Sequence, residues 1–168
     1  TTATIGFDHI DTAYCESQGI AWTNAPGCNA ASLAQYVLNG LVTLSLRTGE
    51  PLRGKTLGIV GVGHVGSIVA RYAEVMGMRV LRNDPPRAER EGGEGFVSLA
   101  QIAAESDVVT LHVPLTKEGA HPTYHLANAA FFGQLAKRPW LINSCRGAVH
   151  DTAALLAAKR EGLISPLI

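Results

Sequence analysis

The feature that most constrains this chain is an apolar stretch that runs directly into three closely spaced glycines. Residues 56–66 read TLGIVGVGHVG, so an expected strand leads into the pattern G-x-G-x-x-G where a helix should begin. The three glycines are Gly61, Gly63 and Gly66. A dinucleotide pyrophosphate requires a tight turn, a place where backbone approaches without a Cβ atom, and close packing of helix on strand. Glycine meets all three requirements, so a dinucleotide site is predicted, although this pattern alone also occurs in ordinary glycine turns.

The helix after the glycines and the strand after that helix supply two more parts of the predicted site. The first helical residues, His64 and Val65, offer N–H groups without intrahelical partners, together with the positive end of the helix dipole. The next strand is expected to end at Asp84, eighteen residues after the third glycine. A carboxylate near this interval accepts hydrogen bonds from the adenosine ribose and repels a 2′-phosphate. The sequence therefore favours NAD over NADP, a preference that the neighbouring Arg82 and Arg87 weaken slightly.

A further buried strand is expected at residues 107–113, which read DVVTLHV. Nearly continuous apolar and β-branched residues are typical of parallel strands that are covered on both faces. Ligands of doubly wound sheets lie beyond the carboxyl ends of the strands, so Val113 and Pro114 should be near the cofactor. His112 has two interpretations, a chemical role at the site or a packed strand residue, and a lone histidine more often has the second.

Strands and helices alternate along most of the chain, which predicts an α/β fold with a Rossmann-type doubly wound parallel sheet. The expected strands cover residues 20–24, 56–60, 79–83, 107–113 and 140–142, the expected helices 30–47, 65–76, 98–106, 127–135 and 152–161, and the expected surface loops 85–95 and 116–125. Residues 164–168, which read ISPLI, are expected to begin a strand that does not continue. The chain also starts abruptly, so we expect a fold that is truncated at both ends.

Particular residues are expected to begin these helices or to bury them. The expected N-caps are Asn29, Ser98 and Asp151. The inner face of helix 65–76 is expected to consist of Val65, Ile68, Val69, Tyr72, Val75 and Met76. Helix 30–47 is apolar on more than one side, which is typical of a helix that is buried in a large body or packs on another subunit.

The composition excludes several classes of function. The formal net charge is zero and no basic stripe is present, so nucleic-acid binding is not expected. No apolar run approaches the roughly 20 residues of a membrane span, and the start lacks the order of a signal peptide, so a cytoplasmic protein is expected. The 3 cysteines are far apart without C-x-x-C spacing, and the 6 histidines include no H-E-x-x-H. Reduced thiols and no metal site are therefore expected.

The order of GIVGVGHVG, Asp84, HVPLT and INSCRGAVHDTAAL resembles the nicotinamide-binding domain of the D-2-hydroxyacid dehydrogenase family over essentially the whole chain. The resemblance implies that residues 1–28 end the first part of a split substrate domain. It implies that residues 29–48 form a crossing helix through which a homodimer assembles, and that residues 49–168 form an NAD-binding Rossmann domain that is incomplete at its C-terminus. Gln35 departs from the family pattern, because related sequences usually have Glu at this position.

The resemblance also implies roles for residues outside the glycine loop. Arg146 matches the family's catalytic arginine, whose guanidinium holds a carboxylate by two hydrogen bonds and polarises the developing oxygen. Without the resemblance, an arginine after a strand end is more often a surface residue. Thr4 matches a substrate-contacting position, and Val113 and Cys145 match positions that touch the cofactor. Cys145 is expected to line the site rather than to act as a nucleophile, because hydride transfer requires no covalent intermediate.

The resemblance implies an NAD-dependent oxidoreductase that removes hydride from C2 of a small phosphorylated hydroxy acid. The shorter motifs PGCNA, NDPPR, HVPLT and TYHL resemble those of family members that act on 4-phosphoerythronate, and this resemblance implies a step of pyridoxal phosphate biosynthesis. The family's general-base histidine and its acid partner would lie beyond residue 168, so this chain alone is expected to bind NAD without turnover. Two alternatives stay open: a dehydrogenase for another 2-hydroxy acid such as 3-phosphoglycerate, and a non-catalytic protein that senses NADH.

Overall fold

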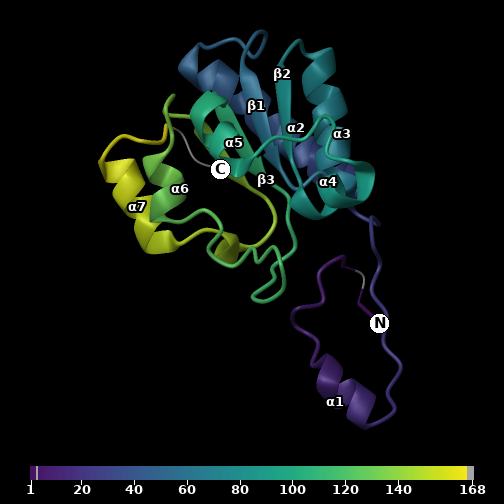
Figure 1. The fold of residues 1–168 in the computed structure, drawn as a ribbon. Coiled ribbons are helices and arrows are strands. Elements are labelled where there is room, and N and C mark those ends of the chain that lie inside the picture. Colours follow the sequence, from purple (N-terminus) through teal and green to yellow (C-terminus); the bar gives the residue numbers. More distant parts are fainter. Residues whose placement is uncertain (3, 166–168) are drawn as a thin grey trace.

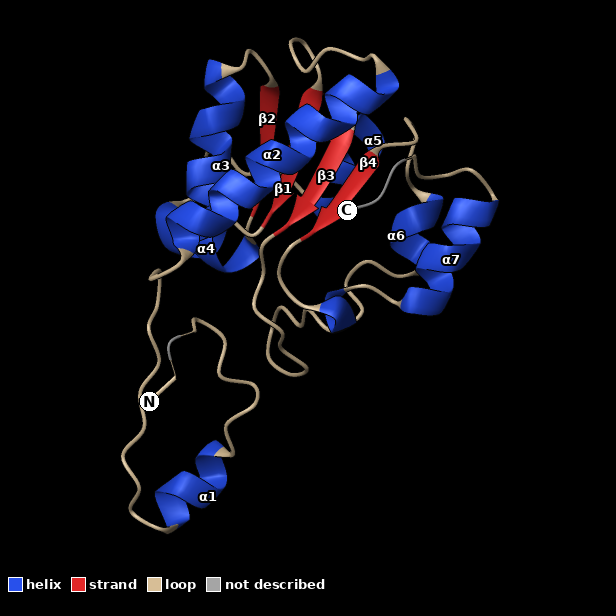
Figure 2. Cartoon of the chain, turned by 180° about the vertical axis from the view of Figure 1, so that it is seen from behind, coloured by secondary structure: helices blue, strands red, loops and turns tan. Residues whose placement is uncertain are grey.

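A sheet of four parallel strands forms the centre of the fold (Figure 2). The computed structural model describes residues 1–2 and 4–165. The strands are β1 (Thr56–Val60), β2 (Arg79–Asn83), β3 (Val108–Leu111) and β4 (Trp140–Asn143), in the spatial order β2-β1-β3-β4. The register pairs the last residues of neighbouring strands: Val60 with Asn83, Val60 with Leu111, and Leu111 with Asn143. The strands therefore end together at one edge, and the expected parallel α/β sheet is confirmed.

Helices cover both faces of this sheet (Figures 1 and 2). The helices of the described residues are α1 (Thr12–Ser17), α2 (Ala30–Thr48), α3 (His64–Val75), α4 (Pro85–Glu91), α5 (Leu99–Glu105), α6 (Ala129–Gly133) and α7 (Thr152–Arg160), with a short 3-10 helix, η1 (Gly147–Val149). Successive strand residues point to opposite faces. Val108 thus joins the core beneath α2 and α3, whereas Val109 joins the core beneath α5, α6 and α7. Among the described residues, no helix combines the length and the apolarity that crossing a bilayer requires.

Two of the three expected capping residues do cap their helices. The side chains of Ser98 and Asp151 accept hydrogen bonds from backbone N–H groups in the first turns of α5 and α7. Asn29 directly precedes α2, but its side chain makes no capping hydrogen bond. At the other end of α2, Gly49 adopts a left-handed conformation with a φ of 73°, as a terminating glycine commonly does.

The expected strand at residues 20–24 is wrong. This segment runs beside Thr2 and Thr4 instead, where the Thr2 N–H donates to the Thr23 carbonyl at 3.0 Å and the Ala25 N–H donates to the Thr4 carbonyl at 3.1 Å. Apolar residues form a strand only where a neighbouring strand can pair with them, and the central sheet lies elsewhere. The segment that carries α1, a helix that the sequence did not predict, extends away from the sheet (Figure 1).

Three further expectations need correction. Residues 85–91 form the helix α4 rather than a loop, because Asp84 caps it and proline at its first position already has a helical φ. On α3, Tyr72 and Val75 do not belong to the buried face, since they are 37% and 85% exposed. Ile164 and Ser165 form no strand, and the remainder of the strand expected at 164–168 lies outside the described residues.

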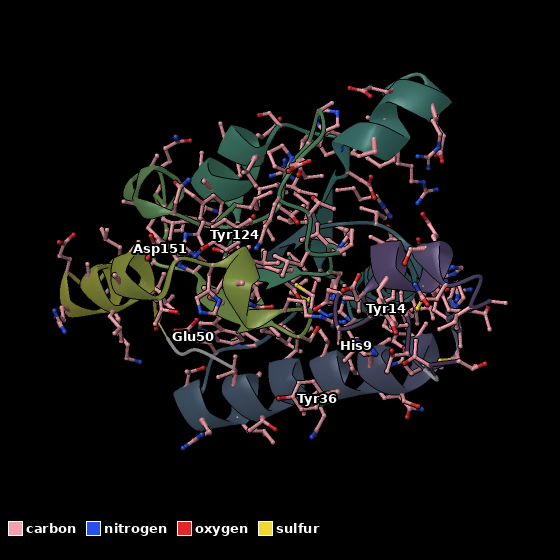
Figure 3. The ribbon with its side chains drawn as sticks, turned by 90° about the horizontal axis from the view of Figure 1, so that it is seen from below. His9, Tyr14, Tyr36, Glu50, Tyr124 and Asp151 are labelled. Atoms are coloured by element: carbon pink, nitrogen blue, oxygen red, sulfur yellow. The ribbon has the colours of Figure 1, made fainter. Side chains whose placement is uncertain are left out.

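The outer surface of α2 keeps several apolar side chains in solvent. Tyr36, labelled in Figure 3, is 53% exposed, and Val42 and Leu46 are 39% and 79% exposed. The opposite side of the same helix buries Val37, Leu41 and Leu44 against the sheet layer. The helix is therefore apolar on more than one side, as its sequence predicts.

Candidate functional site

The glycine loop between β1 and α3 has the geometry that its sequence pattern predicts. Gly61 has a φ of 89°, and a Cβ atom there would lie 2.6 Å from the carbonyl oxygen of His112. A Cβ atom at Gly66 would lie 2.1 Å from the carbonyl oxygen of Gly61, so helix and strand pack without room for a side chain. At Gly63 a Cβ atom would meet nothing within 4 Å. The loop thus combines a tight turn, close packing and an open approach for a ligand.

The backbone N–H and the carbonyl of Val62 both make hydrogen bonds that hold this loop in place. Its N–H donates to Oδ2 of Asp84 at 2.9 Å. Its carbonyl oxygen accepts from Oγ of Ser67 at 3.0 Å and from Nη1 of Arg87 at 2.7 Å. The position of the loop is therefore fixed by residues at the end of β2 and in the first turns of α3 and α4.

Helix α3 begins at the loop without any side-chain cap. Gly63 occupies the N-cap position and makes no side-chain hydrogen bond, so the N–H groups of the first turn, including those of His64 and Val65, have no partner within the helix. The helix has 12 residues, and its positive end faces the open space at Gly63. An anionic group placed there would meet unpaired donors and a favourable dipole.

Asp84 has two structural partners and also faces a cavity. Besides accepting from Val62, its carboxylate accepts from the Arg87 N–H at 3.1 Å as the N-cap of α4. The guanidinium groups of the two neighbouring arginines have other partners. Arg82 pairs with Glu74, and Nε of Arg87 donates to Glu91 at 2.7 Å. Neither arginine is among the described residues that line the cavity at Asp84.

Among the described residues, two cavities at the carboxyl edge of the sheet border the glycine loop, and they share part of their wall. One, of about 440 Å³, lies between the glycine loop, Asp84 and residues 112–126. The other, of about 350 Å³, lies between the glycine loop, residues 144–146 and the N-terminal segment. The shared wall consists of Gly63, His112, Val113 and Pro114.

The structure brings nearly all of the sequence-predicted site residues to these cavities. Those that line the 440 Å³ cavity are Gly61, Gly63, Asp84, Val113 and Pro114. Those that line the 350 Å³ cavity are Thr4, Gly63, His64, Val65, Val113, Pro114, Cys145 and Arg146. Gly66 lines neither, because its position serves the packing of α3 on β1.

His112 lies in the wall that the two cavities share, and both of its ring nitrogens have hydrogen-bond partners. Nε2 lies 2.9 Å from Oγ1 of Thr110, and Nδ1 lies 3.2 Å from Oγ of Ser144. Burial lowers the pKa of His112 to about 4, so the ring is neutral near pH 7. Of its two interpretations, the packed residue fits these contacts better, since both nitrogens already have partners.

Asn143 shapes the loop that follows β4. Its Nδ2 donates to the Arg146 carbonyl at 2.9 Å, and its Oδ1 accepts from the Cys145 N–H at 3.1 Å. The Cys145 thiol also lies 3.1 Å from that oxygen, and burial raises the pKa of the thiol. A protonated, hydrogen-bonded thiol suits a residue that lines a cavity better than a nucleophile.

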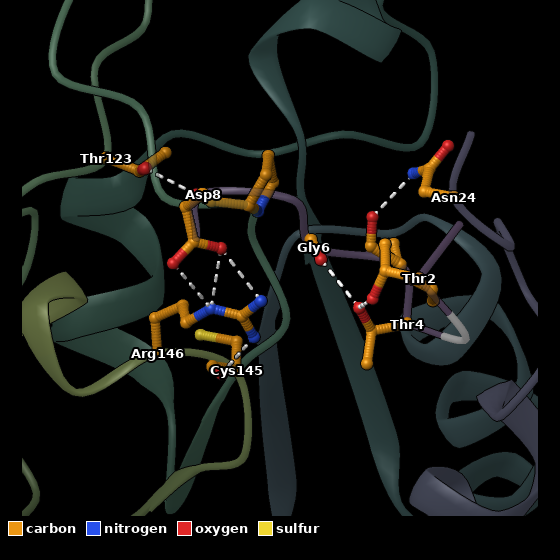
Figure 4. Close-up of polar contacts among 10 residues, drawn as sticks. Thr2, Thr4, Gly6, Asp8, Asn24, Thr123, Cys145 and Arg146 are labelled. Carbon is orange, nitrogen blue, oxygen red and sulfur yellow. Dashed lines mark hydrogen bonds and ion pairs between the residues drawn. The ribbon is translucent and has the colours of Figure 1, made fainter. Parts of the chain in front are cut away.

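The Arg146 side chain points toward the N-terminal segment and pairs there with Asp8 (Figure 4). Its Nε and Nη2 donate to Oδ1 of Asp8 at 3.0 and 2.9 Å, and Nη1 donates to the Cys145 carbonyl at 3.1 Å. The guanidinium holds the pKa of Asp8 below its ordinary value. Sequence reasoning missed Asp8, because a polar residue 138 positions away carries no local sign of a partner.

Gly6 and Thr4 complete this corner of the site (Figure 4). A Cβ atom at Gly6 would lie 1.7 Å from Nη2 of Arg146, so the guanidinium packs directly on the glycine backbone. Oγ1 of Thr4 donates to the Gly6 carbonyl at 2.7 Å and shapes the turn. Within the part of the chain that the structure describes, no three His, Cys, Asp or Glu side chains gather as metal ligands.

The chain is similar to proteins of one family along nearly its whole length. A family model described as D-isomer specific 2-hydroxyacid dehydrogenase, NAD binding domain, matches residues 29–167. The chain is 55% identical over 168 residues to erythronate-4-phosphate dehydrogenase of Bacteroides thetaiotaomicron, which covers 99% of this chain and 48% of that protein. The chain thus spans about half the length of the curated relatives that it matches.

Solved structures of dehydrogenases are also similar to this chain. D-Lactate dehydrogenase from Aquifex aeolicus, complexed with NAD and lactic acid, is 34% identical with a TM-score of 0.82, over 98% of this chain and 54% of that chain. The NAD⁺-bound 3-phosphoglycerate dehydrogenase of Entamoeba histolytica is 30% identical with a TM-score of 0.81, over 97% of this chain and 53% of that chain.

Proposed function

The chain belongs to the D-isomer specific 2-hydroxyacid dehydrogenase family, and from this premise we propose that it is the coenzyme-binding part of an NAD-dependent enzyme that oxidises 4-phosphoerythronate to the 2-oxo acid. The observation that carries the proposal is the placement of the glycine loop, Asp84 and Arg146 around two cavities that share one wall. A dinucleotide and a small acid can meet in such an arrangement. The reaction would be a step of pyridoxal phosphate biosynthesis.

The residues at the 440 Å³ cavity fit NAD. Gly63 leaves backbone open where a pyrophosphate would approach, and the uncapped start of α3 supplies donors for its oxygens. Asp84 would accept hydrogen bonds from the adenosine ribose, and its charge would repel a 2′-phosphate. Val113 and Pro114, in the wall that the two cavities share, and Cys145 at the 350 Å³ cavity would line the nicotinamide part. When bound, NAD would supply the hydride acceptor.

On the substrate side, Arg146 would hold the carboxylate of the hydroxy acid and polarise the oxygen at C2. Thr4 would contact the substrate from the N-terminal segment. His112 is not suited to take the hydroxyl proton, because its ring nitrogens already contact Thr110 and Ser144. From the family resemblance we propose that the general base and its acid partner follow residue 168 and that residues 1–168 alone bind NAD without turnover.

The same resemblance supports a proposed domain organisation. Residues 1–28 would end the first part of the substrate domain, 29–48 would be the crossing helix, and 49–168 would belong to the NAD-binding domain. The exposed apolar side chains of α2 support a homodimer that assembles through this helix. A cytoplasmic location stays a prediction from composition.

Two experiments test the proposed function. Calorimetric titration should show that the complete protein binds NAD more tightly than NADP. A substrate panel should then show that 4-phosphoerythronate is oxidised with a higher kcat/KM than 3-phosphoglycerate or simple 2-hydroxy acids. Preference for another acid would support the alternative dehydrogenase, whereas tight NADH binding without oxidation of any acid would support the sensor.

A further inference from the structure

Asp8 meets the side edge of the Arg146 guanidinium with both carboxylate oxygens. Nε lies 3.0 Å from Oδ1 and 3.3 Å from Oδ2, and Nη2 lies 2.9 Å from Oδ1. The two side chains are 41% and 37% exposed. An ion pair at this exposure contributes little to folding stability. The geometry of the pair is still relevant, because a guanidinium that is held through two of its nitrogens cannot rotate freely about the last bonds of the arginine side chain.

The ion pair with Asp8 leaves some N–H bonds of the Arg146 guanidinium available to a ligand. A guanidinium has five N–H bonds. Asp8 takes the one on Nε and one on Nη2, and the Cys145 carbonyl takes one on Nη1. One N–H bond remains on each terminal nitrogen, which matches the two oxygens of a second carboxylate.

We infer that Asp8 is a positioning residue for Arg146: it holds the guanidinium by its side edge so that the two terminal nitrogens present N–H bonds to the substrate carboxylate in the 350 Å³ cavity. The inference rests on the proposed function, which supplies that substrate. Arg146, Asp8 and Gly6 all line this cavity. The substrate side would therefore be organised by the N-terminal segment as well as by the loop after β4.

Gly6 supports this assignment by a steric observation. The guanidinium lies where a side chain at position 6 would have to be, since a Cβ atom there would approach Nη2 of Arg146 to 1.7 Å and its Cζ to 2.7 Å. The segment thus provides a carboxylate on one side of the arginine and bare backbone on another. Both features fix where the fork lies, and neither requires the pair to stabilise the fold.

The opposite interpretation is that Asp8 occupies the place of the substrate carboxylate and competes with it. The two interpretations predict opposite changes in oxalate affinity when Asp8 is replaced by asparagine. Oxalate, a small dicarboxylate probe, would be titrated calorimetrically into the NADH-loaded complete protein. If Asp8 positions Arg146, Asp8→Asn weakens oxalate binding by about tenfold or more, toward the loss expected when a charged group is misplaced. If Asp8 competes, the same substitution tightens binding, and that result overturns the inference.

A double-mutant cycle shows whether the effect passes through Arg146. Asp8→Asn should weaken oxalate binding in the wild-type background but by less than twofold in an Arg146→Gln background. Equal losses in both backgrounds would overturn the inference. The matched control is Asp11→Asn, an exposed aspartate of the same segment that caps α1 through the Tyr14 N–H and has no contact with Arg146. It should leave oxalate affinity unchanged, and a loss equal to that of Asp8→Asn would also contradict the inference.

Kinetics separates this inference from the proposed function. With 4-phosphoerythronate and NAD, Asp8→Asn should lower kcat/KM by at least tenfold while the Kd for NAD stays within twofold. If the wild-type complete protein oxidises no 2-hydroxy acid, the proposed function fails, whereas the oxalate titration still decides the role of Asp8. Weakened NAD binding in Asp8→Asn equal to the loss of kcat/KM would instead show a general structural role and would overturn the inference.

Discussion

The two sides of the site are built in different ways. The cofactor side, which comprises Gly61 to Gly66 and Asp84, comes from one continuous β-α-β unit and consists largely of backbone. The substrate side, which comprises Thr4, Gly6, Asp8 and Arg146, joins segments that are far apart in the chain and acts mainly through charged side chains. Substitutions at the closely packed positions of the cofactor side should therefore affect folding as well as affinity. Substitutions on the substrate side should affect chemistry and leave the fold intact.

The largest effect should come from Arg146→Gln in the complete protein. We expect kcat/KM for 4-phosphoerythronate to fall by about 10²–10³-fold, the loss typical when one charge-stabilising donor is removed. Because the side chain is 37% exposed, the free energy of unfolding should change by less than about 0.5 kcal/mol. Steady-state kinetics and urea unfolding would measure both. A matching loss of stability would contradict the division between the two sides.

His112 borders both cavities and should make stability depend on pH. Its folded-state pKa of about 4 lies below the ordinary value of 6.5, so between these values the unfolded chain binds a proton that the folded chain does not. The stabilisation is therefore present above pH 6.5 and is lost as the pH falls toward 4, by up to about 3 kcal/mol. Urea unfolding from pH 7.5 to 4.5 would measure it. His112→Asn should flatten the profile, and an equally steep profile in the variant would refute this assignment.

Alanine substitutions at two glycines of the loop should distinguish an effect on folding stability from an effect on NAD binding. Gly66→Ala should destabilise the protein by about 1–3 kcal/mol, because its Cβ atom would overlap the Gly61 carbonyl. Gly63→Ala serves as the matched variant, since its Cβ atom meets no protein atom within 4 Å. It should unfold like the wild type in urea and still bind NAD more weakly in calorimetry. Equal stability losses in the two variants would count against the roles assigned to these glycines.

The smallest of these effects should come from Asp84→Asn. We expect the Kd for NAD to rise about tenfold, as for the loss of one charged hydrogen bond, and the preference over NADP to shrink. Asparagine keeps the size of the side chain, but its one acceptor oxygen can serve only one of the N–H groups of Val62 and Arg87, which bond different oxygens of Asp84. Calorimetric titration of both dinucleotides would test this expectation. Unchanged selectivity would show that Asp84 does not set the preference.

The contrast between the two sides also explains what the sequence could predict. The cofactor side is predictable because its strand, glycines, helix and acid follow one another within about thirty residues, in a pattern whose steric reasons are local. The helix α4 was missed although its signals are equally local: Asp84 can cap a helix and Pro85 suits its first position. The charged residues after them led us to expect a loop.

Other features depend on contacts that no local pattern encodes. The apolar residues 20–24 resemble a strand, but in the fold this segment lies beside Thr2 and Thr4 instead of in a sheet. Arg146 was found only through the family resemblance, and its partner Asp8 was not found at all. Tyr72 and Val75 follow the helical apolar pattern of α3, yet the sheet covers only part of that face.

The hydrogen bonds at the N–H and the carbonyl of Val62 limit how the cofactor preference could be changed from NAD to NADP. The carboxylate that would recognise the ribose also accepts from the N–H of Val62, and Arg87, a cation three residues after Asp84, donates to the carbonyl of Val62. Replacing Asp84 to accept NADP therefore removes an anchor of the loop along with a charge. Recruiting Arg87 to the phosphate would remove one of the two donors to the Val62 carbonyl, the other being Oγ of Ser67. A successful redesign must supply a new acceptor and a new donor for this residue before it adds any contact to the nucleotide.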